Sequence, residues 1–536
     1  MRRFGTQGPV HPSENYVVPR TEQINDFINR IKAGQYVVIF APRQTGKTTF
    51  FQRALDKLTT EAPTYLPIPL NFDVYKDLSV STFYGHLYKQ IRRGIENIYQ
   101  QRGCRPPETL TQFLANTTLT DHLSMLEFFR QLASFLDAQD SEQKVVIIID
   151  EFDGIPEAAL SNFLHTLRHI YIAGKPRCPH SVSIIGVKRI IQLGYDRSIS
   201  PFNIQDEFHL PNFTLEEVRD LFGQYTAEVH QAFDPEVITS TYKQTAGQPV
   251  LVNRLAQILT EEMDIPKNEI ITMSHFTKAH TQLLRRRNTN IEHLTTNIRK
   301  DPRFEKILMR ITAHNDGVDF NLDDEIISEL ATYGVITEGA DGACNIANPI
   351  YLYRILRSFK PTINGLEEIY FSEDNITGFQ TYLTDTGQLD MQPLLDNFCN
   401  FIARAGFQIL QVPQTPRESV GRHLLLTYLD QFVQTVGGSI FLEVQTGRGR
   451  IDICIIHNQQ KYIVETKIWR GESRYQAGKQ QLAAYLKLEK AIEGYYVVFD
   501  HRKVSEQRVE TGTVDGFTIR SYVIPVIQQS PSSLQD

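Results

Sequence analysis

The chain has 536 residues, of which 41% are hydrophobic and 22% are charged, a composition typical of globular proteins. This length is too great for one hydrophobic core, so about three or more domains are expected. The formal net charge of −7 excludes a global electrostatic attraction to nucleic acid or to acidic membranes. Any binding of a polyanion must therefore depend on local basic patches.

The five cysteines are scattered along the chain, without the spacing of a metal site or a disulfide framework. This usage favours a reducing compartment. The first residues contain no apolar run of the kind found in a signal peptide, and no segment approaches the roughly eighteen apolar residues of a membrane span. We therefore expect a cytoplasmic protein that does not bind a membrane.

A short apolar run, Val37–Phe40, is followed by a loop and then by Gly46, Lys47 and Thr48. This order is typical of a phosphate-binding P-loop, although Ala41 replaces its usual first glycine. We expect Lys47 to reach the β- and γ-phosphates of ATP and Thr48 to ligate Mg²⁺. The expected ATP-binding residues of the loop are Ala41, Pro42, Arg43, Gln44, Thr45, Gly46, Lys47, Thr48 and Thr49. An ordinary turn between a strand and a helix is the alternative.

A second apolar run, Lys144–Ile149, ends in Asp150 and Glu151. A continuous apolar run is what a strand buried on both faces requires, and ligands of open α/β sheets bind at the carboxyl ends of the strands. We expect Asp150 to hold the Mg²⁺ shell and Glu151 to polarise the attacking water as the catalytic residue of ATP hydrolysis. A buried strand that simply ends in an acid is the alternative.

Other elements follow from the same periodicities. Strands are expected at 65–72, 181–187 and 207–210, and helices at 48–58, 78–100 and 122–136. Their alternation predicts a parallel sheet covered by helices. Lys188 and Arg189 follow one of the strands, where they are either sensors of the γ-phosphate or solvated loop charges.

From Thr214 the pattern becomes helical. Thr214 and Glu217 form a capping-box-like start, and amphipathic helices then continue to about Arg287, which predicts a helical lid. Residues 303–357 next fit three helices followed by a short hairpin turning at 339–342, an order that predicts a winged helix.

The densest basic cluster in the chain lies between the lid and the winged helix. It consists of Arg285, Arg286 and Arg287, with Arg299, Lys300 and Arg303 nearby. The cluster is either a contact for DNA phosphates or a solvated helix end favoured by the helix dipole.

Near the end of the chain, two expected strands meet at a polar turn at 457–460. Glu465 and Lys467 are two residues apart, so they share one face of the sheet, and the hairpin brings Asp452 beside Glu465. These two carboxylates and the carbonyl of Thr466 are expected to hold Mg²⁺ or Mn²⁺. Lys467 would orient or deprotonate the water that attacks a phosphodiester. Surface patterning on an exposed strand is the alternative, and Glu443 is a further acidic candidate.

Two resemblances extend these predictions. The segments Tyr16–Arg20, Ala41–Thr49, Ser200–Ile204 and Gly247–Pro249 resemble the AAA-ATPase-like group within the STAND and archaeal-type ATPases. The resemblance implies that Pro19 and Arg20 contact adenine and that Pro249 approaches the nucleotide from the lid. It also implies a winged helix that includes Asn348–Tyr351. No clear polar residue matches the sensor Thr or Asn of better-known AAA-plus proteins.

Residues 416–500 resemble the PD-(D/E)XK nuclease superfamily, in the version fused behind AAA-ATPase-like domains. The resemblance implies that Glu418, in the first helix, completes the metal site. It also implies that Gln481, in the helix after the core strands, contacts DNA or a ligand.

The sequence thus predicts an α/β multidomain protein with a P-loop parallel-sheet ATPase core. The expected parts are that core at 1–212, a helical lid at 213–300, a winged-helix-like domain at 301–361, a helical linker at 362–415 and a PD-(D/E)XK-like α/β domain at 416–536. Two functions remain open. One is an ATPase whose nucleotide state regulates a DNA nuclease, and the other is a STAND-type signalling or assembly ATPase whose C-terminal domain only recognises a partner. A nucleotide-dependent homo-oligomer is a further expectation.

Overall fold

The computed structural model describes residues 1–40, 45–137, 143–174, 177–186, 206–285, 302–312, 318–358, 382–403, 417–446, 449–502 and 504–526. It divides into two compact units. The N-terminal unit comprises Arg2–Asn212 with Ala331–Gly334, and the C-terminal unit comprises Phe213–Leu330 with Val335–Asp536. Within the described ranges, no helix is both long and apolar enough to cross a bilayer.

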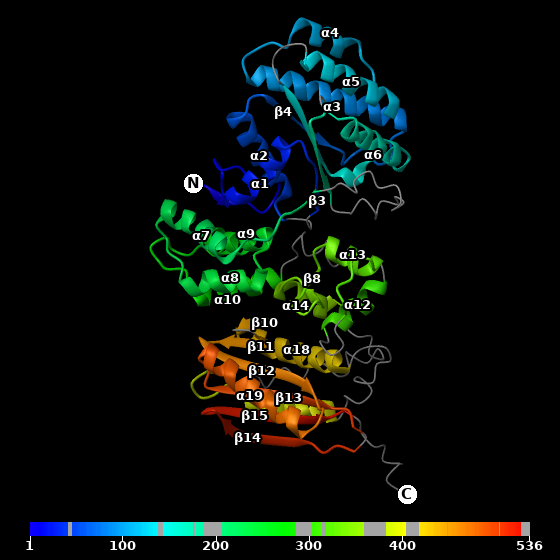
Figure 1. Cartoon of the computed structure of the whole chain (residues 1–536). Helices are drawn as coiled ribbons and strands as arrows, with labels where there is room; N and C mark the ends of the chain where they lie inside the picture. Colours follow the sequence, from blue (N-terminus) through cyan, green and yellow to red (C-terminus); the bar gives the residue numbers. More distant parts are fainter. Residues whose placement is uncertain are drawn as a thin grey trace. The chain divides into compact units, whose positions relative to one another are not determined.

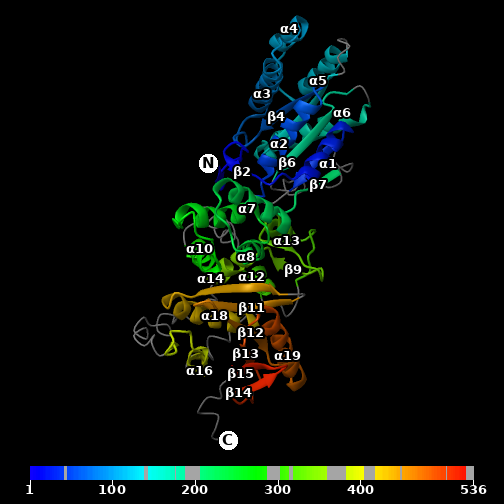
Figure 2. The ribbon, with the colours of Figure 1, turned by 90° about the vertical axis from the view of Figure 1, so that its left-hand side faces the viewer.

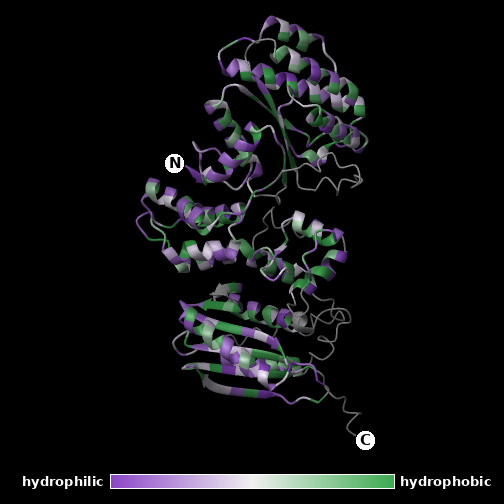
Figure 3. Cartoon of the chain, in the orientation of Figure 1, coloured by the Kyte–Doolittle hydropathy of each residue, from purple (hydrophilic) through white to green (hydrophobic). Residues whose placement is uncertain are grey.

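A five-stranded parallel sheet forms the centre of the N-terminal unit, in the order β4-β5-β6-β3-β7 (Figure 1). Its strands are β3 (Tyr36–Phe40), β4 (Tyr65–Asn71), β5 (Lys144–Asp150), β6 (Ser181–Gly186) and β7 (Asp206–His209). The visible strands are mostly hydrophobic along their length (Figure 3), as burial on both faces requires. The predicted parallel sheet is thus confirmed, with strand ends that differ by one or two residues.

Helices cover both faces of this sheet, because successive side chains of a strand point to opposite faces. Val37 and Ile39 of β3 pack with helices α1 (Thr21–Lys32) and α2 (Lys47–Glu61). Val38 packs into a second cluster on the other face. The helices of that cluster are α3 (Val80–Gln101), α4 (Glu108–Asn116), α5 (His122–Asp137) and α6 (Glu157–Ile172). The short elements β1 (Arg3–Phe4), β2 (Asn15–Tyr16) and η1 (Phe152–Gly154) complete this unit.

The C-terminal unit begins with helices. They are α7 (Leu215–Val229), α8 (Pro235–Thr245), α9 (Pro249–Gln257), the π-helical turn η4 (Ile258–Glu262) and α10 (Met273–Arg285). Thr214 caps α7, and the reciprocal bond from Glu217 completes a capping box, as the sequence predicts. The next elements are α12 (Pro302–Thr312), α13 (Glu325–Thr332), the hairpin β8 (Ile336–Glu338) and β9 (Cys344–Ile346), and α14 (Pro349–Ser358). In the described ranges two of these helices precede the hairpin and the third, α14, follows it. The predicted order, with all three helices before the hairpin, is therefore wrong, and the winged helix remains a prediction.

The last part of the C-terminal unit is a mixed six-stranded sheet in the order β10-β11-β12-β13-β15-β14. Its strands are β10 (Ser439–Thr446), β11 (Gly449–His457), β12 (Gln460–Ile468), β13 (Glu493–Asp500), β14 (Arg508–Val514) and β15 (Phe517–Pro525). Helices α18 (Arg417–Thr435) and α19 (Glu472–Glu489) lie on opposite faces of it (Figure 2). Gly421 of α18 approaches Phe499, whereas Gly478 of α19 approaches Tyr496, and residues three apart on a strand face opposite sides.

Two features of this sheet determine where its side chains meet. Asn458 and Gln459 both have positive φ, 45° and 67°, as a two-residue hairpin turn requires, and this turn aligns β11 with β12. Helix α16 (Met391–Phe401) lies within the range expected to be a linker, yet Phe398 packs on Tyr428 of α18 at 5.3 Å between ring centroids. The described part of that range therefore contacts the domain that carries the sheet.

Candidate functional site

The P-loop lies between strand β3 and helix α2. Gly46 has a φ of 84°, a left-handed conformation that glycine adopts without strain, and α2 starts at the next residue, Lys47. Among the described residues no side chain caps this helix, and its first turn carries no acid, so its positive end suits an anion. The predicted residues Ala41, Pro42, Arg43 and Gln44 lie outside the described ranges.

The two motifs of the sheet meet at its carboxyl edge. The hydroxyl of Thr48 donates to Oδ2 of Asp150 at 3.2 Å, and the backbone N–H of Glu151 donates to Oδ1 at 3.0 Å. Burial raises the pKa of Asp150, while these hydrogen bonds and the charge of Lys47 partly oppose the rise. Glu151 has a φ of 50°, a strained conformation for a residue with a side chain and one often found at functional sites.

This donor set fits a nucleotide with its magnesium ion. A hydroxyl and a carboxylate oxygen are the ligands that Mg²⁺ prefers, and a cation beside Asp150 would offset the penalty of burying its charge. Strand β3 has β6 on one side and β7 on the other, and ligands of open α/β sheets bind where the strand order reverses. The sequence prediction placed Thr48 and Asp150 in one site, and they are in hydrogen-bond contact.

The N-terminal segment packs against helix α2. The N–H of Val10 donates to the Thr49 hydroxyl at 3.1 Å, and Arg53 donates to the carbonyl of Val18 at 2.7 Å. Arg20 is buried and donates to the carbonyl of Pro211 at 3.0 Å. The adenine contact expected of Arg20 and of Pro19 beside it remains a prediction.

The Gly-x-Pro motif of the lid has a structural reason at each position. Gly247 has a φ of 68°, and a Cβ there would lie 1.9 Å from the carbonyl oxygen of Phe213. Gln248 is buried and donates to the Tyr351 hydroxyl at 2.7 Å, and it accepts from the Asn348 amide at 3.1 Å. Pro249 opens helix α9. The segments Gly247–Pro249 and Asn348–Tyr351, which both belong to the AAA-ATPase-like resemblance, therefore meet through Gln248. The nucleotide contact of Pro249 remains a prediction.

In the C-terminal sheet, β11 and β12 separate beside the predicted metal site. Their pairing ends at Ile453 and Val464, although both strands continue. Beyond this point the Asp452 carboxylate accepts from the N–H and the hydroxyl of Thr466, both at 2.7 Å. The N–H of Asp452 donates to Glu465 Oε2 at 3.4 Å. Side-chain hydrogen bonds thus replace the backbone hydrogen bonds between the two strands. We call this opening between β11 and β12 the fork, and the predicted carboxylates of Asp452 and Glu465 lie in it.

The charges in the fork are close and buried. Glu465 is 1% exposed; burial and the neighbouring Asp452 raise its pKa to about 8, although Lys467 opposes the rise from 2.8 Å. A divalent cation would relieve this repulsion, so the donor set fits one. Within the described ranges no three His, Cys, Asp or Glu side chains gather as a ligand set. The Thr466 carbonyl and water would complete the shell, and the Glu418 side chain lies outside the description.

Arg422 is the residue of this site that the sequence interpretation missed. It comes from α18, is 3% exposed, and pairs with Glu443 at 2.5 Å while lying 4.0 Å from Asp452. Burial alone would lower the pKa of Arg422, but Glu443 and Asp452 hold it above its usual range. Glu443 has a φ of 47°. The only sequence signal for Arg422 was its position one turn after Glu418 on an expected helix. Arginines on helices are too common for that position to single it out.

A hollow of about 270 Å³ adjoins Lys467. Trp469, Arg474, Tyr475 and the predicted Gln481 line it, and Gln481 donates to the Tyr485 hydroxyl at 2.7 Å. Aromatic rings beside exposed cations are the usual surface for unpaired bases and phosphates.

The predicted basic cluster is mostly outside the described ranges. Arg286, Arg287, Arg299 and Lys300 fall there, as does the side chain of Arg285, while Arg303 lies 3.8 Å from Glu325. Lys188, Arg189 and the segment 200–204 also lie outside the description. Their expected roles remain predictions.

Comparison with known proteins gives two family matches and several relatives. A model described as "Domain of unknown function (DUF8371)" matches residues 392–503. An uncharacterized WD repeat-containing protein of Synechocystis sp. (strain ATCC 27184 / PCC 6803 / Kazusa), slr0143, is 22% identical over 265 residues, which are 48% of this chain and 21% of that protein. The chain thus spans about a fifth of the length of this curated relative.

Three solved structures are similar over about two thirds of the chain. They are the Walker-type ATPase PABY2304 of Pyrococcus abyssi (12% identity, 66% of this chain and 99% of that one, TM-score 0.45), the Orc1 protein of Aeropyrum pernix in complex with DNA (14%, 64% and 93%, TM-score 0.31) and Cdc6p of Pyrobaculum aerophilum (13%, 66% and 96%, TM-score 0.34). These TM-scores are too low to add to the assignment.

The decisive match is to the model described as "AAA-like domain", which covers residues 6–354. It includes the P-loop at Gly46–Thr48 and the Gly-x-Pro motif at Gly247–Pro249. Because this match spans more than half of the 536 residues, the chain belongs to the AAA-like family and carries its P-loop ATPase domain.

Proposed function

We propose that the chain is an ATPase whose nucleotide state regulates a metal-dependent DNA nuclease formed by its C-terminal sheet. The observation that carries the nuclease half is the fork between β11 and β12, where Asp452, Glu465 and Lys467 meet. The ATPase half is supported by the contact between Thr48 and Asp150.

The chemistry follows from the side chains of the fork. A cation held by Asp452 and Glu465 would supply Lewis acidity to the phosphate. In the hydrolysis a water oxygen bonds to phosphorus, one P–O ester bond breaks, and the departing oxygen takes up a proton. Lys467 orients the attacking water and offsets the charge that develops on the phosphate.

The hollow beside Lys467 gives the DNA strand a place to bind. Trp469 is half-buried beside this hollow, with the Arg502 guanidinium over its ring at 4.8 Å, so a base would contact the part of the ring that remains exposed. Arg474 offers a charge for the backbone. Trp469 is the single tryptophan of the chain, so its emission is expected to change when DNA binds. Gln481 at the same hollow is the expected polar contact.

Cleavage of linear, circular and single-stranded DNA in Mg²⁺ or Mn²⁺ tests the nuclease. We expect Lys467→Ala and Asp452→Asn to lose about a hundredfold or more of the wild-type rate. Lys487→Ala is the matched control, because Lys487 is exposed in the last turn of α19. If wild type and Lys467→Ala leave the same residual nicking in every condition, the nuclease proposal is wrong.

Regulation of cleavage by ATP is tested in a separate experiment. Adding ATP should change the cleavage rate of wild type, and Lys47→Ala should abolish that response, since the P-loop lysine contacts the phosphates. A response to ATP that survives Lys47→Ala contradicts control by this P-loop.

The alternative is a STAND-type assembly ATPase with a C-terminal recognition module. It is favoured by Arg422 and Lys467, which already neutralise the acids of the fork. This alternative expects an ATP-dependent increase in mass, measured by light scattering, which Lys47→Ala removes. A wild type that keeps one mass with and without ATP counts against assembly.

A further inference from the structure

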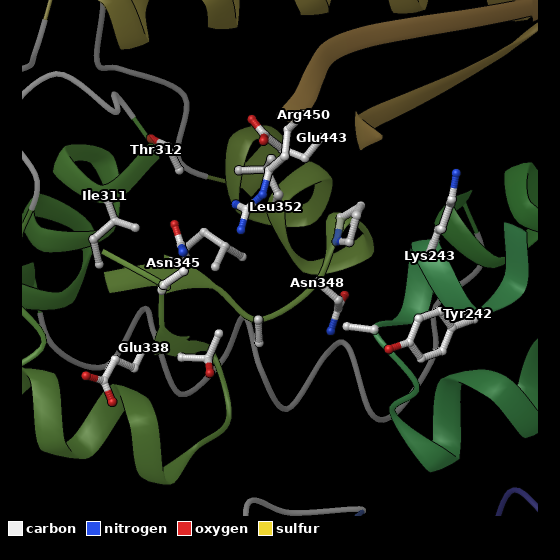
Figure 4. A pocket seen from close by; sticks show the side chains of 17 residues that line it. Tyr242, Lys243, Ile311, Thr312, Glu338, Asn345, Asn348, Leu352, Glu443 and Arg450 are labelled. Carbon is white, nitrogen blue, oxygen red and sulfur yellow. The ribbon is translucent and has the colours of Figure 1, made fainter. Parts of the chain in front are cut away.

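A second hollow, of about 250 Å³, has no part in the function proposed above (Figure 4). It lies within the C-terminal unit, between α8, the β8–β9 hairpin, the start of α14 and strands β10 and β11. A water molecule occupies about 30 Å³ of liquid, so this space exceeds what ordered waters need. It lies just below the roughly 300–1,000 Å³ of pockets for drug-sized ligands, so it suits a small organic ligand.

Two cationic side chains line this hollow. Lys243 of α8 and Arg450 of β11 line it from different sides (Figure 4). Both are half-buried, and neither forms an ion pair with a residue in the described ranges. Helix α14 begins at Pro349 on the same hollow, but its start is already capped, because the N–H of Tyr351 donates to Asn348 Oδ1 at 2.9 Å and proline has no N–H. The two cations, rather than the helix start, therefore make the hollow a site for an anion.

The acids of the hollow do not cancel this charge. Glu443 is paired with Arg422 at 2.5 Å, so its charge is already compensated. Glu338 is exposed at the rim, where water screens it. The net charge of the side chains inside the hollow is therefore positive.

The rest of the lining suits the uncharged part of a ligand. Ile311 and Leu352 are buried apolar side chains of the wall, and Tyr242 presents an aromatic ring (Figure 4). Asn345 supplies an amide that can donate and accept. A ligand complementary to this surface has an anionic group at one end and a ring or another apolar body at the other.

We propose that this hollow binds a small phosphate-bearing molecule of about the size of a mononucleotide. Lys243 and Arg450 hold the phosphate from the two sides of the hollow, because a dianion can offset both cations whereas a carboxylate can offset only one. Ile311 and Leu352 contact the uncharged body. The proposal does not depend on nuclease activity or on ATP hydrolysis.

The test is calorimetric titration of the full chain with AMP in a Lys47→Ala background, which removes the P-loop lysine. We expect saturable binding of one AMP per chain, weakened at least tenfold by Arg450→Ala and by Lys243→Ala. Lys487→Ala, which removes an exposed lysine of α19, should leave the affinity unchanged. The emission of Trp469 checks that each variant is folded, and if Arg450→Ala fails to fold, Lys243→Ala decides.

Two results would overturn the proposal. One is the absence of saturable AMP binding, or an affinity that neither Arg450→Ala nor Lys243→Ala changes. The other concerns the source of the phosphate, since a DNA end also carries one. If a 5′-phosphorylated oligonucleotide binds through Arg450 while AMP does not, the site serves DNA and the small-molecule proposal is wrong.

Discussion

At the scale of single residues, Arg422 changes how the acid cluster of the C-terminal sheet must be understood. The cluster holds Glu443, Asp452 and Glu465 on three neighbouring strands, and all three carboxylates are buried. Arg422 compensates the first two, and Lys467 compensates the third. These two cations offset only part of the cost of burying the acids, because burial and Asp452 still raise the pKa of Glu465 to about 8. A metal ion would relieve the repulsion that remains.

Removing Arg422 tests this compensation. Arg422→Ala leaves buried carboxylates without a partner, so we expect it to lower the free energy of unfolding by about 3–5 kcal/mol. The urea midpoint, followed by the emission of Trp469, measures the loss in the domain that carries it. Arg422→Met combined with Glu443→Leu should recover much of the midpoint, because it removes both charges. An unchanged midpoint in Arg422→Ala contradicts the compensating role.

At the scale of elements, the Gly-x-Pro motif joins the helices that begin at α7 to helix α14. Gly247 lets the backbone approach Phe213 closely, and this places Gln248 where it satisfies Asn348 and Tyr351. All three side chains are buried, so a mismatch would leave polar groups without hydrogen bonds. Two motifs that are distant in sequence thus depend on each other.

Two glycines of the lid provide a matched comparison. Gly247→Ala places a Cβ 1.9 Å from a carbonyl oxygen at a φ of 68°, so we expect it to cost at least about 1–3 kcal/mol. Gly223→Ala lies in helix α7 with nothing within 4 Å, and there alanine should stabilise the helix by about 1 kcal/mol. Thermal melting of the two variants should therefore shift in opposite directions. Shifts of the same sign would contradict the close approach at Gly247.

The strength of the local signal decided which elements could be predicted from the sequence. The unbroken apolar run of β5 predicts its bounds, and the P-loop pattern predicts the contact of Thr48 with Asp150. The hairpin of β14 and β15 was missed, because β14 lies at the edge of the sheet and its side chains are mostly exposed, so it lacks an apolar signal. Arg422 was missed because its contacts exist only after α18 has packed on the sheet.

At the scale of the whole molecule, the lid also packs directly on the C-terminal sheet. The ring of His280 in α10 stacks on Phe441 of β10 at 4.5 Å, and Thr281 and Ser439 share a hydrogen bond of 2.6 Å. His280 is 1% exposed, and neither ring nitrogen has a partner in the described ranges. Burial lowers the pKa of His280 to about 3, so it is neutral in the folded chain.

This neutral histidine predicts a pH dependence of stability. The unfolded chain binds a proton at His280 below about pH 6.5 while the folded chain does not, so stability is complete above that pH and falls as the pH drops towards 3. At pH 5 the loss should be about 2 kcal/mol. His280→Phe keeps a ring at the stack and should remove this part of the difference between urea midpoints at pH 7.5 and pH 5. An equal pH dependence in both proteins rules out His280 as its source.

Because α10 packs on β10, the boundary between the sequence families differs from the boundary between the compact units. Families recognised by sequence divide the chain between residues 354 and 392. The contacts instead keep helices α7–α10, helices α12 and α14 and the C-terminal sheet in one unit that begins at Phe213. A chain cut at the boundary between the families would leave the rings of Phe276 and His280 without the β10 surface that covers them. The part of the chain that a sequence family covers is therefore not the part that packs as one unit. Designs that graft another C-terminal domain onto this ATPase must rebuild the face of α10.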